Sequence, residues 1–323
     1  MKTKFIKYVL PLIFSVGCLA GCGDEGGESG TDPVNPEYYK NYDLTLEGIW
    51  LENELQTLCF DTHKVFVRYG QVNSYYSQTS THDSVEAVPS TINTKDRTCK
   101  NEWFYTGKVA SGVGTREHVW PCANSDELWT HGGGSGGTHD VDNSNYTGGG
   151  SDLYHVRTAN SAVNTARGNS KFVDFEDFPA IAGQAEPVTE KNGKYELLCQ
   201  GFKTSSTGKI EYSQKVEVDD HMKGDVARIL CYVYVHYGER GNAPKSTDKT
   251  KDYMLGNLSF TNILGYDSVS DCAQKLIEWN ELDPVSDVEK HRNNAVQKIQ
   301  GNRNPFVDYP NLVRQMLQDY IEL

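Results

Sequence analysis

The segment REHVWP, residues 116–121, and the segment DLYHVRTANSAVNTARGNSKF, residues 152–172, decide the fold of this chain. The first segment reads as the end of a strand. The second reads as a strand over 153–157 followed by a short helix over 159–167. Between them lies a glycine-rich loop, residues 124–152, which contains no lysine or arginine. Strand, long loop, strand and helix therefore follow one another, and a long loop inside a compact domain often has a function.

Three side chains of these segments carry chemistry: the carboxyl group of Glu117, the imidazole of His118 and the amide of Asn164. Glu117 and His118 belong to the first strand, and Asn164 belongs to the short helix after the second strand. This arrangement resembles the ββα-metal, or His-Me finger, core of the bacterial endonuclease I family. The segment WNELDPVSDVEKHRNNAVQKIQGNRNPFVDYP, residues 279–310, also resembles this family. Two long matches in the family's order argue against chance.

The resemblance, over roughly residues 100–172 and 220–312, implies an α+β fold in which a small ββα-metal core is embedded in a largely helical body. Apolar residues at helical spacing support this in the C-terminal third. Residues 71–100 are polar enough to predict loops. Helices are expected over 222–237, over 268–280, from Asp283 to Gly301 and over a last amphipathic segment around residues 312–320.

The resemblance assigns His118 the role of general base and Glu117 and Asn164 the role of metal ligands. An imidazole accepts a proton from water near neutral pH, and one divalent ion can stabilise the leaving oxygen. Carboxylate and amide oxygens suit Mg²⁺, with Mn²⁺ or Ca²⁺ as alternatives. Neighbouring strand residues point to opposite faces, so Glu117 and His118 share one site only if the backbone is distorted there.

A charged transition state also needs a cation, and the loop over 124–152 has none to offer. Arg157 at the end of the second strand is the expected catalytic clamp, because a guanidinium can bind two phosphate oxygens at once. The alternative is that Arg157 pairs with an acid such as Asp152 and the metal alone handles the charge. Arg116 and Arg167 are the next candidates.

Arg116, His155 and Arg167 are the expected substrate-binding residues. Each has a structural alternative. His155 could pack in the core or orient His118, and Arg167 could form an ion pair with Glu117. Asn164 could likewise cap a turn instead of binding metal.

The resemblance implies a metal-dependent endonuclease that hydrolyses DNA with little sequence preference, and the sequence leaves open whether RNA is also a substrate. The net charge of −13 works against this reading, because affinity for phosphates comes largely from lysine and arginine. The contact face must therefore be locally basic. A non-catalytic surface lipoprotein that binds nucleic acid or glycan is the first alternative, and an esterase of small phosphodiesters is the second.

The N-terminus, MKTKFIKYVLPLIFSVGCLAGC, has the basic start and short apolar stretch of a signal peptide. It ends in Leu-Ala-Gly-Cys, which resembles a bacterial lipobox and implies lipidation of Cys22. The expected organisation is a signal peptide over 1–21, a flexible tether over 22–40 and one endonuclease I-like domain over 41–323. The protein is expected to be a monomer anchored by lipid in the cell envelope, at the outer membrane or cell surface.

Six cysteines follow Cys22, and export to an oxidising compartment predicts disulfides among them without fixing the pairing. They are Cys59, Cys99, Cys122, Cys199, Cys231 and Cys272.

Substitution Cys22→Ser should release the protein from membranes, because acyl chains on this thiol would supply the anchoring free energy. The measurement is fractionation of cells that express the wild type or the variant. A variant that stays with the membrane fraction after a salt wash would show that Cys22 is not the anchor.

Overall fold

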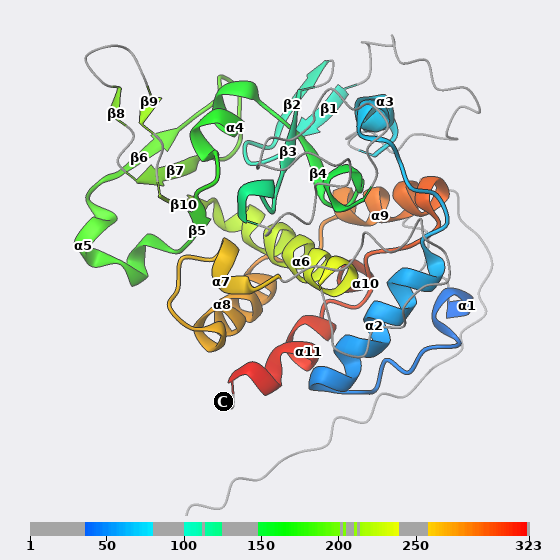
Figure 1. Ribbon diagram of the computed structural model, residues 1–323. Helices are drawn as coiled ribbons and strands as arrows, with labels where there is room; N and C mark the ends of the chain where they lie inside the picture. The colour runs from blue at the N-terminus through cyan, green and yellow to red at the C-terminus, as the bar shows by residue number, and fades with distance from the viewer. Residues whose placement is uncertain are drawn as a thin grey trace, which may run out of the picture. The chain divides into compact units, whose positions relative to one another are not determined.

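The computed structural model describes residues 36–79, 100–111, 114–124, 148–200, 203–204, 210–211, 214–238 and 258–321 (Figure 1). The predicted signal peptide, Cys22, most of the predicted tether, residues 125–147 of the glycine-rich loop and Cys99 lie outside these ranges. The described elements are mixed α and β, with several helices and small sheets.

The ββα unit consists of β3 (Thr115–His118), β4 (Val156–Ala159) and α4 (Ser161–Arg167). β3 and β4 are antiparallel, with Glu117 opposite Arg157 and His118 opposite Val156. The side chain of Asn160 accepts hydrogen bonds from the backbone N–H groups of residues 162 and 163, which caps α4 directly after β4. The chain therefore turns from strand into helix within two residues.

Two more β structures adjoin this unit. The hairpin of β1 (Lys100–Trp103) and β2 (Lys108–Ser111) contains Phe104 directly after β1, and this residue forms a bridge with Ala159 at the end of β4. A four-stranded sheet has the order β5-β10-β7-β6. Its strands are β5 (Lys171–Phe172), β6 (Ala185–Val188), β7 (Leu197–Gln200) and β10 (Lys215–Val218), and a separate pair is formed by β8 (Lys203–Thr204) and β9 (Ile210–Glu211).

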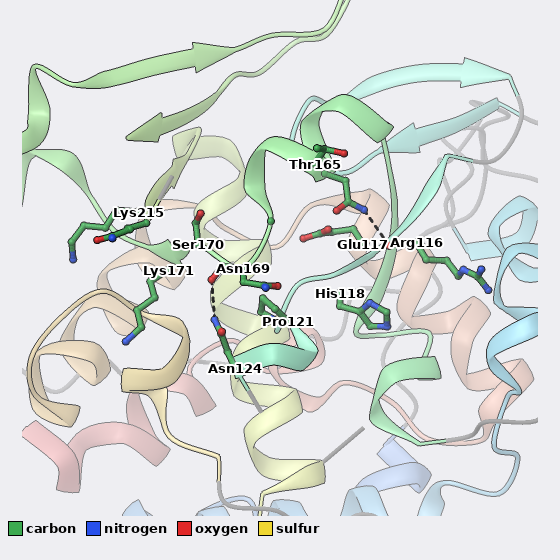
Figure 2. Close-up of a pocket in the computed structure, with 13 residues that line it drawn as sticks. Arg116, Glu117, His118, Pro121, Asn124, Thr165, Asn169, Ser170, Lys171 and Lys215 are labelled. Carbon is green, nitrogen blue, oxygen red and sulfur yellow. Dashed lines mark hydrogen bonds between the residues drawn. The ribbon is translucent and has the colours of Figure 1, made fainter. Parts of the chain in front are cut away.

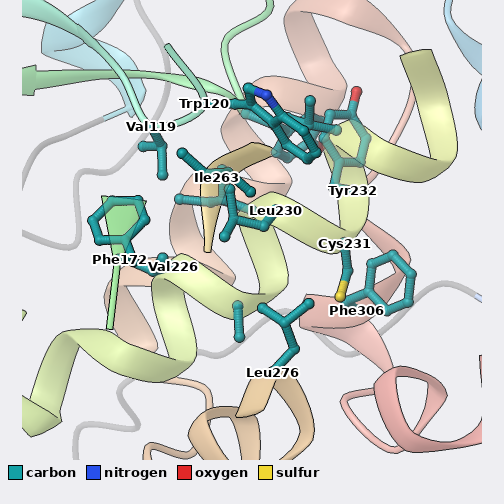
Figure 3. Packing of buried hydrophobic residues seen from close by; sticks show 14 of the residues in the cluster. Val119, Trp120, Phe172, Val226, Leu230, Cys231, Tyr232, Ile263, Leu276 and Phe306 are labelled. Carbon is teal, nitrogen blue, oxygen red and sulfur yellow. The ribbon is translucent and has the colours of Figure 1, made fainter. Parts of the chain in front are cut away.

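Helix α6 (Asp220–Tyr237) lies at the centre of the core, and nearly all of its residues are buried. It packs against α2 (Gly48–Thr62) and α8 (Val269–Leu282), and α11 (Leu312–Ile321) packs against both of these helices. Figure 3 shows Val226 and Leu230 of α6 among Phe172 of the sheet and Trp120 beyond β3. The hydrophobic core therefore joins the ββα unit to the helical body.

Helix α9 (Asp287–Gln300) reaches the ββα unit through a buried guanidinium. Arg292 donates hydrogen bonds to the backbone carbonyl oxygens of Leu153 and Val156, at the start of β4. A residue far away in the sequence thus holds β4, the strand that pairs with the site-bearing strand β3.

Three predictions of secondary structure were wrong, each for a local reason. Helix α9 begins at Asp287, not near Asp283, because Ser286 and Glu289 form a reciprocal capping box. The second strand runs over 156–159, since residues 153–155 turn before it. Within the predicted loop over 71–100, residues 72–79 form α3 (Val72–Thr79), whose Val72 and Tyr76 are buried.

The disulfide prediction was wrong for the four cysteines whose side chains the structure describes. Cys59, Cys199, Cys231 and Cys272 are all buried, and none of them forms a disulfide. Their burial is that of small apolar side chains in the core. Cys99 and the side chain of Cys122 lie outside the described residues. Within the described ranges, no helix combines the length and the hydropathy that a membrane span requires.

Candidate active site

A cavity of about 880 Å³ opens beside the ββα unit, between β3, α4 and the β5–β10 edge of the sheet (Figure 2). It brings together the predicted residues Glu117, His118, Asn164 and Arg116. Among the residues that the structure describes, its lining is Arg116, Glu117, His118, Pro121, Asn124, Asn164, Thr165, Gly168, Asn169, Ser170, Lys171, Gln214 and Lys215.

Glu117 forms the buried acidic end of this cavity. Its Oε1 atom accepts a hydrogen bond of 2.7 Å from the hydroxyl of Tyr105 and lies 3.6 Å from Nε of Arg167. Burial raises the pKa of Glu117 to about 7, although Arg167 and the Tyr105 hydroxyl both act to lower it. A second cation near this carboxyl group would favour its ionised form.

His118 lies at the last position of β3, where its ring orientation is fixed. Its Nε2 atom is 2.8 Å from the carbonyl oxygen of Gly150. A carbonyl oxygen only accepts, so in the neutral ring Nε2 carries the proton and Nδ1 carries the lone pair. The ring of Tyr69 stacks on His118 with a centroid distance of 5.8 Å. The geometry therefore selects the tautomer that a base at Nδ1 requires.

Glu117 and His118 line the same cavity although they are neighbours on a strand. The strand ends at His118 and the chain bends over residues 119–120. The two side chains therefore approach one cavity from the end of the strand, where the strict alternation of faces no longer applies.

Asn164 approaches from α4. Its amide nitrogen donates hydrogen bonds of 3.1 Å to the carbonyl oxygen of Arg116 and to the hydroxyl of Thr115. Because the nitrogen is directed to β3, the amide oxygen is the atom suited to bind a cation. A carboxylate oxygen and an amide oxygen in one cavity fit a hard divalent ion that retains several waters.

Arg167 and His155 lie behind the cavity wall. Arg167 is fully buried, and its guanidinium donates to the carbonyl oxygens of Val119, at 2.6 Å, and His118, at 3.4 Å. His155 is fully buried as well, with Nδ1 2.8 Å from the Gly149 carbonyl oxygen and Nε2 accepting from the Trp120 N–H at 2.9 Å. Both residues therefore hold the backbone that carries the cavity residues.

The two arginines proposed as phosphate clamps lie in different places. Arg116 lines the cavity, and its guanidinium stacks over the ring of Tyr69 at 3.9 Å. Arg157 instead lines a smaller pocket, where its guanidinium lies over Phe104 and 3.9 Å from Asp225. The clamping role predicted for Arg157 stays a prediction.

The cavity also contains two lysines that sequence analysis did not identify, Lys171 and Lys215. Their ammonium groups donate to backbone carbonyl oxygens, Lys171 to Thr261 at 2.6 Å and Lys215 to Gly265 at 2.7 Å. Burial and the neighbouring Lys171 lower the pKa of Lys215. They are ordinary lysines in the sequence, and only the pairing of β5 with β10 brings them together.

Comparisons with known proteins agree with the geometry. The family model described as Endonuclease I matches residues 94–311. The chain is 34% identical over 202 residues to an extracellular ribonuclease of Bacillus subtilis, which covers 62% of this chain and 52% of the relative. It is 26% identical over 197 residues to Endonuclease-1 of Buchnera aphidicola, which covers 59% of this chain and 60% of the relative. The chain thus spans about half the length of the extracellular ribonucleases that it matches.

His155 should make the protein sensitive to acid. Burial lowers its pKa from 6.5 to about 3, so below pH 6.5 the unfolded chain binds a proton that the folded chain excludes. Stability is therefore unaffected above pH 6.5 and is lost as the pH falls toward 3. Between pH 6.5 and 4.5, wild type should lose about 2–3 kcal/mol more unfolding free energy than His155→Gln.

Urea unfolding at several pH values measures this difference. The control is His221→Gln, because His221 is exposed and its hydrogen bond to Asp219 raises its pKa. This control should not reduce the acid loss. Equal acid slopes for wild type and His155→Gln would contradict the assignment of a buried neutral imidazole.

Proposed function

Because the chain belongs to the Endonuclease I family, we propose that it is a divalent-metal-dependent nuclease that hydrolyses phosphodiester bonds in DNA and RNA. The observation that carries this proposal is the convergence of Glu117, His118 and Asn164 on one cavity. These three groups supply a base and two hard oxygen ligands, which suffices for metal-assisted hydrolysis. The relatives include both a ribonuclease and an endonuclease, which supports a broad choice of substrate.

In this mechanism His118 is the general base. Its Nε2–H group donates to the Gly150 carbonyl oxygen, so Nδ1 accepts the proton of the attacking water. Stacking on Tyr69 restricts rotation of the ring. When Nδ1 takes up the proton and the ring becomes charged, the Gly150 carbonyl oxygen stabilises the imidazolium through its hydrogen bond from Nε2–H.

Glu117 and Asn164 are the proposed metal ligands, with Mg²⁺ as the expected ion. When bound, the ion supplies Lewis-acid stabilisation of charge on the phosphate and the leaving oxygen. Tyr105 and Arg167 orient the Glu117 carboxylate through a hydrogen bond and a near ion pair. Asn164 is oriented by its two hydrogen bonds to β3.

A local excess of positive charge lets an acidic chain hold a polyanion. Among the described residues, the lining of the cavity contains Arg116, Lys171 and Lys215 against one carboxyl group, that of Glu117. We assign the two lysines to phosphates of the bound strand and Arg116 to the phosphate under attack. Arg116 adjoins both catalytic side chains in β3, whereas Arg157 lines another pocket.

The protein is proposed to act outside the cytoplasm. The sequence begins with a signal-peptide-like segment, and two relatives carry the name extracellular ribonuclease. Lipidation at Cys22 would keep the domain over 41–323 at the cell envelope through the tether over 22–40. The Cys22→Ser fractionation tests this placement independently of activity.

Substitution His118→Ala should lower kcat by about 10²–10⁴-fold, because a positioned general base contributes about that factor. Plasmid nicking and cleavage of a labelled RNA, each with Mg²⁺ or EDTA, measure the effect. Glu117→Gln and Asn164→Ala should weaken the response to Mg²⁺, with partial rescue at higher concentration. His221→Ala is the matched control, because this imidazole is exposed.

Two results would overturn the proposed function. One is cleavage by folded His118→Ala within tenfold of wild type. The other is wild-type activity that survives EDTA. A wild type that binds nucleic acid and cleaves none of it would instead favour the binding lipoprotein.

Substitutions of the three cationic residues of the cavity should affect different kinetic constants. Arg116→Ala is expected to lower kcat, because a guanidinium on the reacting phosphate acts in the transition state. Lys171→Ala and Lys215→Ala should raise KM and reduce the salt dependence of binding with little change in kcat. Arg157→Ala should leave both constants of the folded enzyme close to wild type.

The opposite pattern would restore the role predicted from the sequence. If Arg157→Ala loses kcat and Arg116→Ala retains it, Arg157 is the clamp. Arg157→Lys then recovers only part of the rate, because an ammonium group keeps the charge and loses the planar fork.

A further inference from the structure

A second group of possible metal ligands lies outside the cavity, in the core. The imidazoles of His63 and His236 and the carboxyl group of Asp152 each offer one ligand atom, and these atoms lie within 4.8 Å of one another. His63 follows the end of α2, Asp152 follows the short turn η3 (Gly149–Ser151), and His236 lies in the last turn of α6. All three residues are buried and none lines the cavity of the proposed active site.

The two imidazoles face each other through ring nitrogens, the atoms that would bind an ion. Nδ1 of His63 lies 2.8 Å from Nε2 of His236. The other ring nitrogen of His63, Nε2, is 3.1 Å from the carbonyl oxygen of Val65. That carbonyl oxygen holds a proton on Nε2, so the lone pair of Nδ1 points to the cluster. Histidines that bind metals are commonly oriented by such a hydrogen bond to a backbone carbonyl.

The carboxyl group of Asp152 is held by hydrogen bonds from both sides. Oδ2 accepts from the hydroxyls of Tyr232, at 2.8 Å, and Tyr237, at 2.5 Å. Oδ1 accepts from the N–H of Tyr154 at 2.7 Å and from the amide of Gln300 at 3.3 Å. Outer contacts of this kind orient carboxylates that bind metals.

Gln300 also connects the segments that carry two of the three ligands. Its backbone carbonyl oxygen accepts hydrogen bonds from the N–H groups of Lys64 and Val65, next to His63. Its side chain bonds to Asp152 and to the N–H of Leu153. The two ligand segments therefore hold a mutual position that does not depend on an ion.

We propose that His63, Asp152 and His236 form a structural site for Zn²⁺. Two imidazoles and one carboxylate are a donor set that zinc accepts readily, whereas magnesium and calcium prefer oxygen ligands alone. Tetrahedral zinc with Zn–N bonds of about 2.0–2.1 Å places two nitrogens about 3.3 Å apart. The rings therefore separate by about half an ångström when the ion enters, and the proton of His236 moves from Nε2 to Nδ1 of the same ring.

We describe the site as structural because its three ligands are buried, out of reach of a nucleic-acid strand. A bound ion would join the end of α2, the segment after η3 and the end of α6. Gly150 of η3 accepts the hydrogen bond that orients His118, so the ion would also steady the proposed base. This last consequence rests on the proposed function, while zinc binding itself does not.

The test counts zinc on the full chain carrying Glu117→Gln and Asn164→Ala, which removes the proposed catalytic ligands. After EDTA treatment and dialysis against Zn²⁺, elemental analysis should find one equivalent of zinc per chain. Free zinc at 100 times its Kd should raise the ratio of folded to unfolded protein about 100-fold in urea unfolding. Adding His63→Gln and His236→Gln should abolish both effects.

The outcomes decide the proposal even if the histidine variants fold poorly. A background protein that takes up no zinc, or gains no stability from it, overturns the site. Folded histidine variants that keep one equivalent also overturn it, because the zinc then lies elsewhere. A wild-type protein that has no nuclease activity but still binds zinc at these histidines would contradict the proposed function and support the zinc site.

Discussion

The buried guanidinium of Arg167 is the contact on which the candidate active site depends. Arg167 ends α4 and donates to the carbonyl oxygens of His118 and Val119 at the end of β3. It also lies 3.6 Å from the Glu117 carboxyl group. The helix that carries Asn164 is thereby locked to the strand that carries Glu117 and His118. Removing one partner from a buried charged contact lowers the free energy of unfolding by about 3–5 kcal/mol. Substitution of Arg167 is therefore expected to destabilise the fold.

The helical body contributes by closing polar contacts over long distances in the sequence. Arg292 of α9 bonds to the backbone around β4, and Tyr232 and Tyr237 of α6 bond to Asp152. Buried polar groups are costly unless every partner is present. The same contacts that stabilise the core therefore fix the segment over 148–155, whose carbonyl oxygens orient His118 and His155.

The distribution of charge is compatible with the proposed polyanionic substrate, although the chain as a whole is acidic. Net charge describes long-range repulsion, whereas binding depends on the few charges within a Debye length of the phosphates. The lysines of β5 and β10 and Arg116 lie around one cavity. Buried acids such as Asp174 and Glu289 are instead paired with lysine or arginine inside the protein.

The sequence by itself determined the ββα order, the short helix with Asn164, the central helix over 222–237 and the trio of Glu117, His118 and Asn164. These features are local, since a strand, a capped helix and a family motif are each contained in one short segment. Helix α3 and the start of α9 were missed, because a buried face and a capping box outweighed composition. Tertiary structure alone decided that Arg116 and not Arg157 lines the cavity, that Lys171 and Lys215 join it, and that four cysteines are buried without disulfides. It alone also brought His63, Asp152 and His236 together. Each of these features depends on which distant segments of the chain meet in space. The spacing of residues along the sequence does not show which segments meet.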